Sequence, residues 1–379
     1  MSNNDHNLPV SLYVHFPWCV HKCPYCDFNS HPLKQELPET LYIDRLLHEL
    51  EEFDGVLHQR TIQSIFLGGG TPSLFSGAAI EKLLLHINNK QYALPAMEIT
   101  LEANPGTVDH QHFRDYVKAG VNRLSIGIQS LDDQQLKNIG RIHDAKQAIG
   151  ALESARDAGF NNINLDVMFG LPKQTQEAAL TDLQRVIELD PEHISWYQLT
   201  IEPNTYFHQF PPQLPEDDAI WTLQTEGQRL LSHAGYPQYE VSAYAKKNRQ
   251  CQHNLNYWQF GDYLGIGAGA HSKLTKQGVS QRHWNVKHPK AYMDNSRSLK
   301  AGSKMIKPAE LVFEFFLNRM RLMESISETE FVTKTGRSFA DIKETLDGLI
   351  NKKLIRMDPA LSLTQRGRAM LNEVLLAWL

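Results

Sequence analysis

Apolar and polar positions along the first 240 residues follow two alternating periods. Short runs rich in β-branched and aromatic residues predict strands at 11–16, 62–68, 97–103, 122–129, 163–170 and 193–200. The segments that follow these runs repeat apolar residues at i, i+3 and i+4, as amphipathic helices do. The predicted helices cover 41–53, 79–89, 110–120, 145–159, 177–189 and 219–235, and several end in glycine, a common helix stop.

Strand–helix units repeated in this way predict a parallel sheet and an α/β fold. Six such units are too few for a closed eight-stranded barrel, so we expect an open or partial barrel. Periodicity alone does not separate that form from a doubly wound sheet.

Composition narrows the class of protein only a little. Hydrophobic residues are 41% and charged residues 21%, as in ordinary globular proteins, and the net charge of −5 gives no basic field for nucleic acid or anionic lipid. The first ten residues lack the basic start and apolar core of a signal peptide. No apolar run reaches the length that crosses a bilayer. With four cysteines and no secretory signal, we expect a cytoplasmic protein.

Three cysteines near the start of the chain carry the strongest chemical signal. Cys19, Cys23 and Cys26 are separated by gaps of three and two residues, which places three thiols on one loop. Soft thiolates on such a loop suit a cubane iron–sulfur cluster, in which each takes one iron and the fourth iron stays open. Zinc with a nearby histidine (His15, His21 or His31) remains an alternative by spacing. Disulfides are disfavoured because three cysteines leave one thiol over.

Glycine and polar residues follow the predicted strands where each one ends. A glycine-rich segment lies at 68–72, Glu102 and Gln129 stand at the ends of the next two strands, and Asp166 lies in the fifth. Ligands of parallel α/β folds bind at the carboxyl ends of the strands, and glycine lets the backbone approach a ligand closely. We therefore expect these positions to surround one site beside the cysteine loop.

The cysteine loop, with Tyr25 before its last cysteine, and the GGGTP segment resemble the radical S-adenosyl-L-methionine (SAM) superfamily. More narrowly, residues 11 to about 275 resemble the oxygen-independent coproporphyrinogen III oxidase family. The resemblance implies a partial (β/α)6 barrel with a 4Fe–4S cluster on Cys19, Cys23 and Cys26, and SAM at the open iron. It places around SAM the residues Tyr13, Gly69, Gly70, Thr71, Glu102, Gln129, Arg141 and Asp166.

Two features depart from the members of that family that oxidise coproporphyrinogen. The pattern of those members is CxxxCxxCxC, with a further cysteine two positions after the third cluster ligand. In this chain that position holds Phe28. Their chains are also longer, with a substantial segment before the cluster loop. In this sequence, 18 residues precede Cys19. Both departures argue against oxidative decarboxylation of coproporphyrinogen.

The run from His253 to Trp258 fits the motif HNxxYW, which marks the haem chaperone branch of the family. The resemblance makes His253 the axial ligand of haem iron; Asn254 would orient the ring, and Tyr257 and Trp258 would offer flat faces to the porphyrin. The alternative is a core histidine with packed aromatic neighbours. Cys251 is a competing soft ligand, although a buried inert thiol is the simpler interpretation.

The composition changes beyond residue 300, so we expect two domains, 1–300 and 301–379. The second resembles the small, mainly helical, winged-helix-like domain of the same family, with a strand pair turning at Asp358–Pro359. Its 12 Lys and Arg against 10 Asp and Glu do not form the basic stripe of a DNA reader. A cap over the barrel opening or a surface for partner proteins is the more economical role.

The resemblance implies a haem chaperone that binds haem and passes it to acceptor haemoproteins such as respiratory enzymes. A homodimer and at most transient membrane association are compatible with it, and nucleic acid is not an expected partner. The rival hypotheses are an oxygen-independent coproporphyrinogen III dehydrogenase and, more weakly, a cluster-based redox sensor. The sequence leaves open whether SAM is cleaved productively and whether haem and SAM share a cavity.

Overall fold

The computed structural model describes residues 8–106 and 110–379. The start of the chain, where the signal-peptide prediction applies, therefore lies mostly outside the described residues. Within the described part, every strand predicted from the first 200 residues forms, within a few residues of its expected bounds. The strands are β1 (Val10–Phe16), β4 (Ile62–Gly69), β5 (Ala93–Ala103), β6 (Arg123–Gln129), β7 (Ile163–Phe169) and β8 (His193–Gln198).

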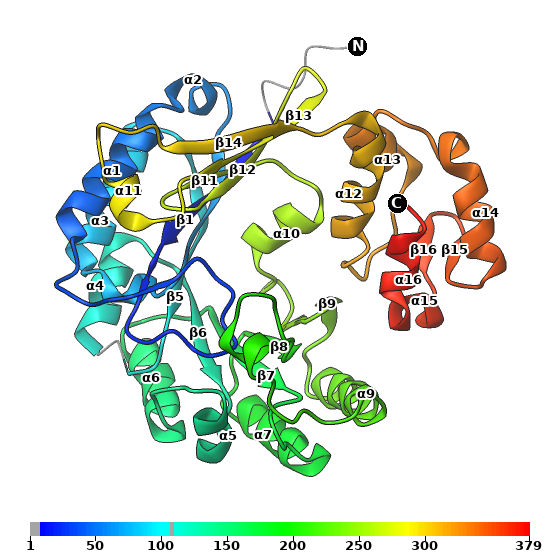
Figure 1. Ribbon diagram of the computed structural model, residues 1–379, viewed down its shortest axis with the longest axis horizontal. Coiled ribbons are helices and arrows are strands. Elements are labelled where there is room, and N and C mark those ends of the chain that lie inside the picture. Colours follow the sequence, from blue (N-terminus) through cyan, green and yellow to red (C-terminus); the bar gives the residue numbers. More distant parts are fainter. Residues whose placement is uncertain (1–7, 107–109) are drawn as a thin grey trace.

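These strands are parallel and lie side by side in the order in which they occur along the chain. A doubly wound sheet would instead reverse direction at a switch point. The order confirms the predicted partial (β/α)6 barrel and excludes the doubly wound alternative. Figure 1 shows the strands curving around the interior, with the helices on the outside.

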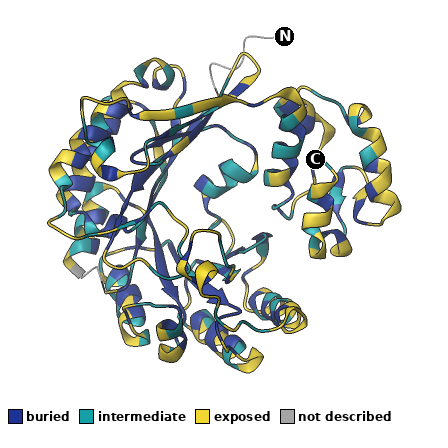
Figure 2. Ribbon diagram, viewed as in Figure 1, coloured by how far each residue is buried: buried dark blue, intermediate teal, exposed yellow. Residues whose placement is uncertain are grey.

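The outer helices pack their apolar faces on the sheet, and Figure 2 shows dark buried strands inside and exposed outer helix faces. Side-chain caps begin several of them: the Ser76 hydroxyl accepts from the Ala79 amide, and Asp144 and Gln147 form a capping box. The helices are α1 (Glu39–Glu51), α3 (Gly77–Asn89), α4 (His110–Ala119), α6 (Ala145–Asp157), α7 (Gln176–Glu188) and α9 (Asp217–His233).

The barrel sheet is extended at both edges by strands that the sequence did not predict. β11 pairs in parallel with β1, and antiparallel strands continue from it, while β10 and β9 extend the edge at β8. The added strands are β9 (Gln238–Glu240), β10 (Ala243–Ala245), β11 (Tyr263–Ile266), β12 (His271–Lys276), β13 (Val279–Asn285) and β14 (Lys300–Met305). A two-turn helix, α10 (Gln252–Trp258), connects the two extensions.

The C-terminal residues form a second hydrophobic core that begins at Ile306. β14 still belongs to the barrel sheet, so the expected boundary at 300 falls at the start of that strand. We call residues 306–379 the C-terminal domain; Figure 1 shows its helices as a separate group beside the barrel. Its main elements are α12 (Pro308–Arg319), α13 (Glu328–Thr335), α14 (Lys343–Asn351), β15 (Ile355–Met357), β16 (Leu361–Leu363), α15 (Gln365–Ala369) and α16 (Leu371–Leu376).

The shorter elements complete the chain and position its loops. They are β2 (Trp18–Cys19), β3 (His31–Pro32), α2 (Asp54–Leu57), α5 (Asp133–Asn138), α8 (Tyr206–Gln209) and α11 (Pro289–Tyr292). Among the described residues, no helix has the length and apolar character needed to span a bilayer.

Candidate functional site

The carboxyl ends of the parallel strands open into a cavity of about 430 Å³, a size typical of small-molecule sites. Its described lining residues all fall between Cys19 and Glu202, so they come from the barrel and its loops. The lining brings together ten of the predicted site residues: Cys19, Cys23, Cys26, Gly69, Gly70, Thr71, Glu102, Gln129, Arg141 and Asp166. None of the described lining residues comes from the C-terminal domain, so this domain does not cap the cavity.

The cysteine loop forms one wall of this cavity. Strands β2 and β3 pair at its base, and the Cys26 amide donates to the Cys23 carbonyl at 3.1 Å. All three thiols are free, with Cys19 buried and the other two partly buried. Burial raises the pKa of the Cys19 and Cys26 thiols above its ordinary value, so iron would displace a proton from each of these two.

The described residues contain no group of three His, Cys, Asp or Glu side chains placed to share a single metal ion. A cubane does not need such convergence, because each thiolate binds a different iron. Of the three histidines named for the zinc alternative, His21 lines the cavity. His15 is buried, with its ring nitrogens 2.9 Å from the Tyr13 hydroxyl and from the Asn29 carbonyl. His31 has its Nε2 atom 3.3 Å from Asn29 Oδ1.

Backbone atoms at the end of β4 line the cavity because two glycines stand there. Gly69 has φ +120°, and a Cβ atom at this position would lie 2.6 Å from His15 Cε1. A Cβ atom at Gly70 would collide with the Trp18 carbonyl oxygen. The glycines therefore let the strand end lie directly against the cysteine loop, which gives the cavity its cradle shape.

Two partly buried carboxyl groups face the cavity from neighbouring parts of the sheet. Glu102 accepts a hydrogen bond from the Gly69 amide at 2.9 Å, and burial raises its pKa to about 8, with Asp166 adding to the shift. Burial also raises the pKa of Asp166, which accepts from Ser125 at 3.0 Å and from Asn164 at 2.8 Å. A cationic or hydroxyl-rich ligand would compensate the burial of these groups.

Arg141 brings a positive charge to the cysteine loop. Its Nη2 atom donates to Asn104 Oδ1 and to the Gly127 carbonyl, both at 2.7 Å, and its Nη1 atom lies 3.7 Å from Cys23 Sγ. Its buried Nε atom has no hydrogen-bond partner among the described residues. An unsatisfied buried donor beside a thiol fits a site built for an anionic group, such as a cluster or a carboxylate.

Gln129 and Thr71 complete the polar lining. Gln129 has φ +64°, a strained conformation that turns the end of β6, and its side chain accepts from the Tyr197 hydroxyl at 2.7 Å. Thr71 accepts from Asn104 at 2.8 Å. The thiols, the glycine cradle and the facing carboxyls together fit a 4Fe–4S cluster with SAM. When bound, this pair supplies one-electron chemistry that the side chains alone do not have.

Tyr13 is not among the described lining residues of the cavity, and its hydroxyl lies 2.9 Å from His15 Nδ1. Its ring packs against Phe66 and His253, with centroids 6.3 and 6.5 Å away. Direct contact between Tyr13 and SAM therefore stays a prediction.

His253 lies at the opposite, amino-terminal end of the barrel. It is 1% exposed, and its Nδ1 and Nε2 atoms lie 3.1 Å from Ser64 Oγ and 3.2 Å from the Tyr257 hydroxyl. Ser64 and its register partners Ser11 and Glu98 all precede the cavity-lining ends of their strands. Burial lowers the pKa of His253 to about 3, so the imidazole is neutral.

Helix α10, which carries His253, begins on the carboxylate of Glu98. That carboxylate accepts from the amides of Gln252 and His253, both at 3.1 Å, and the Cys251 thiol lies 3.5 Å from it. Burial raises the pKa of Cys251 to about 12, which keeps this thiol protonated and favours the inert interpretation over iron binding. Arg123, 2% exposed, lies 3.9 Å from Glu98 and shares this buried polar region.

Several cavity residues escaped the sequence analysis. Ser125 and Ser195 line the cavity from the interiors of β6 and β8, and Tyr197 lies next to the last residue of β8. The available signal was the period of two: residues that alternate along a strand with apolar ones face the barrel interior. Phe28 also lines the cavity, and its side chain is 59% exposed.

Two family models match this chain: the radical SAM superfamily over residues 13–186 and the HemN C-terminal domain over residues 306–370. Proteins named Heme chaperone HemW are 50% identical in Haemophilus influenzae and 48% identical in Escherichia coli. Each alignment covers 97% of this chain and 97% of the relative. A protein of the same name in Bacillus subtilis is 34% identical, over 97% of this chain and 99% of its own length.

Among solved structures, coproporphyrinogen III oxidase (HemN) of Escherichia coli is similar in fold. It superposes with a TM-score of 0.84 at 22% identity, covering 98% of this chain and 90% of that one. This likeness concerns the architecture of barrel and C-terminal domain. With full-length relatives near half identical and a matching radical SAM domain, the chain belongs to the HemW family of the radical SAM superfamily.

Proposed function

We propose that this protein is a haem chaperone that binds haem and transfers it to acceptor haemoproteins such as respiratory enzymes. The observation that carries this proposal is the 48–50% identity, over 97% of the chain, to proteins named Heme chaperone HemW. In the proposal, Cys19, Cys23 and Cys26 bind a 4Fe–4S cluster whose open iron takes SAM. Thiols that must stay reduced for a cluster place the protein in the cytoplasm, and a homodimer is compatible with the proposal.

Phe28 supports a carrier rather than a coproporphyrinogen dehydrogenase. Its aromatic ring lines the cavity. In the pattern of the coproporphyrinogen-oxidising members, the same position holds a further cysteine. A phenyl ring neither transfers a proton nor coordinates a metal. We therefore do not propose oxidative decarboxylation, although the barrel has the corresponding fold.

His253 is the proposed axial ligand of haem iron. Its neutral imidazole is in the protonation state that iron requires. Ligation also requires a free ring nitrogen, and both nitrogens have protein partners within 3.2 Å. Both residues belong to α10, so the proposal includes a displacement of this helix from the barrel together with a rotation of the Tyr257 side chain away from His253.

The test uses anaerobically reconstituted protein in two parallel assays. One titrates haem into wild type, His253→Ala and Cys251→Ala and follows the Soret band. The other supplies coproporphyrinogen III, SAM and a reductant and analyses the product. We expect haem binding that His253→Ala weakens and Cys251→Ala leaves intact, with no protoporphyrinogen formed. Turnover of coproporphyrinogen without haem binding would establish the dehydrogenase instead.

A further inference from the structure

Helix α10 is held at its two ends by different parts of the molecule. Glu98 of the barrel caps its beginning, as described above. The end of the helix is held by the C-terminal domain: Phe260, two residues beyond α10, is buried in that domain's core with its ring 5.9 Å from that of Phe315. The segment that carries His253 therefore contacts the barrel at its beginning and the core of the C-terminal domain at its end, before β11 returns to the barrel sheet.

One set of contacts runs from His253 to the C-terminal domain through aromatic side chains. The Ser64 hydroxyl donates to Ser11 at 2.8 Å, so Ser64 accepts from His253 Nδ1–H, and Nε2 accepts from the Tyr257 hydroxyl. Nε2 is then the nitrogen with the lone pair that a metal would bind, and the Tyr257 hydroxyl occupies it.

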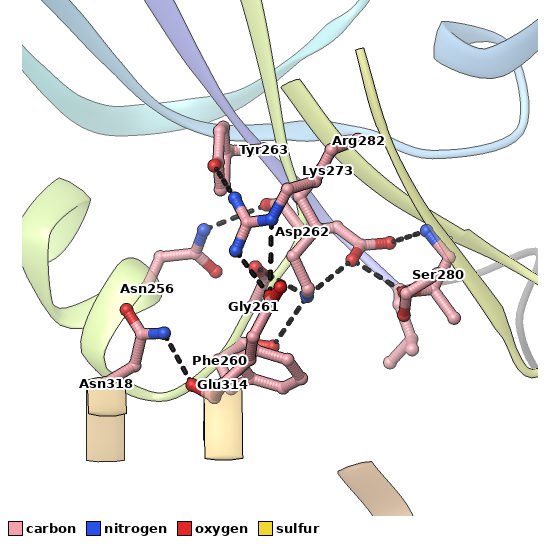
Figure 3. A network of polar contacts seen from close by, with 12 residues as sticks. Asn256, Phe260, Gly261, Asp262, Tyr263, Lys273, Ser280, Arg282, Glu314 and Asn318 are labelled. Atoms are coloured by element: carbon pink, nitrogen blue, oxygen red, sulfur yellow. Dashed lines mark hydrogen bonds and ion pairs between the residues drawn. The ribbon is translucent and has the colours of Figure 1, made fainter. Parts of the chain in front are cut away.

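The Tyr257 ring is held in turn by an ion pair between the domains. It packs edge-to-face on Tyr263, with centroids 4.5 Å apart, and the Tyr263 hydroxyl accepts from Arg282 Nη1 at 2.7 Å. Arg282 of β13 also donates to Glu314 of α12 at 2.7 and 3.2 Å. Figure 3 shows Arg282 between Tyr263 on one side and Glu314 on the other.

A second set of contacts holds the last residue of α10. The Arg321 guanidinium lies 4.4 Å from the centre of the Trp258 ring and donates to Glu240 of β9 at 3.0 Å. Leu322, the next residue, packs in one apolar cluster with Trp258. Arg321 of the C-terminal domain thus contacts both β9 at the barrel edge and helix α10.

We propose that the C-terminal domain is a latch: it fixes the end of helix α10 through Trp258 and the Tyr257 side chain through Tyr263, so that the Tyr257 hydroxyl covers the Nε2 atom of His253 until these contacts are released. Glu314 and Arg321 are its positioning residues. The inference rests on the proposed function, since it explains how a buried histidine becomes available to haem iron. It also assigns a role to the domain that the cavity geometry leaves without one.

The test measures access to His253 without haem, in the full-length, cluster-loaded protein. The latch variant is Glu314→Gln/Arg321→Gln, which leaves the net charge unchanged. Its matched control, Lys343→Gln/Asp347→Asn, removes an exposed ion pair within α14 of the same domain. Diethyl pyrocarbonate labels accessible neutral imidazoles, and peptide mass spectrometry gives the rate at His253, with the exposed His58 as internal reference.

We expect the labelling rate at His253 to rise about tenfold in the latch variant, because this is the factor that the loss of two modest contacts gives. The control should label His253 at the wild-type rate. Glu314→Gln alone should give a smaller increase, and it guards against a double variant that fails to fold. Equal labelling rates in wild type and in a folded latch variant would overturn the latch. Faster labelling confined to a variant whose C-terminal domain has unfolded, with Glu314→Gln unchanged, would overturn it as well.

Haem is added only in a second experiment. The latch and the assignment of His253 as the haem ligand can therefore be rejected independently. If the latch controls access to the iron ligand, haem association should accelerate in the latch variant and lose this acceleration when His253→Ala is added. Faster labelling with haem binding insensitive to His253→Ala would keep the latch and reject His253 as the ligand. Unchanged labelling rejects the latch whatever the haem titration gives.

Discussion

Glu102 is partly buried and His253 fully buried, and removal from water shifts the pKa of these two side chains in opposite directions. The pKa of Glu102 rises to about 8 and that of His253 falls to about 3, because the charged form is disfavoured in each case. Both groups are therefore neutral near pH 7 when the site holds no ligand. For His253 this is the form that binds iron, whereas Glu102 must lose a proton to pair with a cation.

Glu102→Gln should weaken SAM binding and stabilise the protein without ligand at high pH. The folded pKa, about 8, lies above the unfolded value of about 4.3, so stability is greatest below the unfolded pKa and falls as pH rises through 8. Glutamine removes this fall, so the variant should melt at a higher temperature than wild type at pH 8.5. SAM affinity should fall about 10- to 100-fold, measured by calorimetry.

The pH profile of SAM binding provides the control for this substitution. Wild-type affinity should rise between pH 6.5 and 8 more steeply than that of Glu102→Gln, because only wild type has the carboxyl group to ionise. Parallel profiles would contradict the assignment of Glu102 to the ligand, and a melting temperature that drops in the variant at pH 8.5 would contradict the raised pKa of Glu102.

Cys23→Ala should abolish the iron–sulfur cluster, because a cubane with one open iron needs all three thiolates of the loop. Cys251→Ala is the matched control: its thiol is buried at the far end of the barrel and should leave the cluster absorption intact. Iron and sulfide content after anaerobic reconstitution checks both. A full cluster spectrum in Cys23→Ala, or zinc retained in place of iron, would reject the ligand set.

Among the elements, helix α10 depends on one carboxylate from another part of the chain. Glu98 accepts both of the first helical amides and neighbours the buried Arg123. Glu98→Ala should lower the free energy of unfolding by about 3 kcal/mol or more, because it uncaps the helix and removes the ion-pair partner of the buried Arg123. Urea unfolding measures the difference.

The exposed Glu153 of α6 provides the comparison for Glu98. Glu153→Ala should change stability by less than about 0.5 kcal/mol. A loss in Glu98→Ala as small as this would mean that Arg123 is satisfied by other groups and that α10 does not depend on the cap.

The sequence predicted the barrel elements well because period and burial agree there. β6 is buried along its whole length and α6 carries a complete capping box, so local pattern and tertiary packing coincide. β14 was missed because it is exposed along nearly its whole length and shows no alternation. Its pairing with β13 depends on partners that a local pattern does not contain.

The functional residues likewise include some whose placement the sequence predicted and others whose placement it did not. The cysteine loop and the strand ends could be predicted, since the carboxyl ends of parallel strands meet at one edge. The placement of His253 could not, because Ser64, Glu98 and Tyr13, which surround it, come from strands far away in sequence. A motif identifies its residues but gives neither the direction of the side chain nor its burial.

In the whole molecule, the cavity and helix α10 lie at opposite ends of the barrel. The cavity opens at the carboxyl ends of the strands, while His253 packs near Ser11 and Ser64 at their beginnings. Haem on His253 and SAM in the cavity therefore should not compete. The haem dissociation constant should change less than about threefold when SAM is saturating. Mutual exclusion of the two ligands would place haem in the cavity instead.

Haem handover to an apoprotein examines the proposed function most directly. Anaerobically reconstituted, haem-loaded protein is mixed with an apo-b-type cytochrome, and the Soret band of the acceptor is followed over time. We predict transfer to the acceptor that is lost when His253→Ala replaces wild type, without any change in porphyrin oxidation. Haem that stays on the protein, or transfer at the same rate from His253→Ala, would contradict a chaperone acting through this residue.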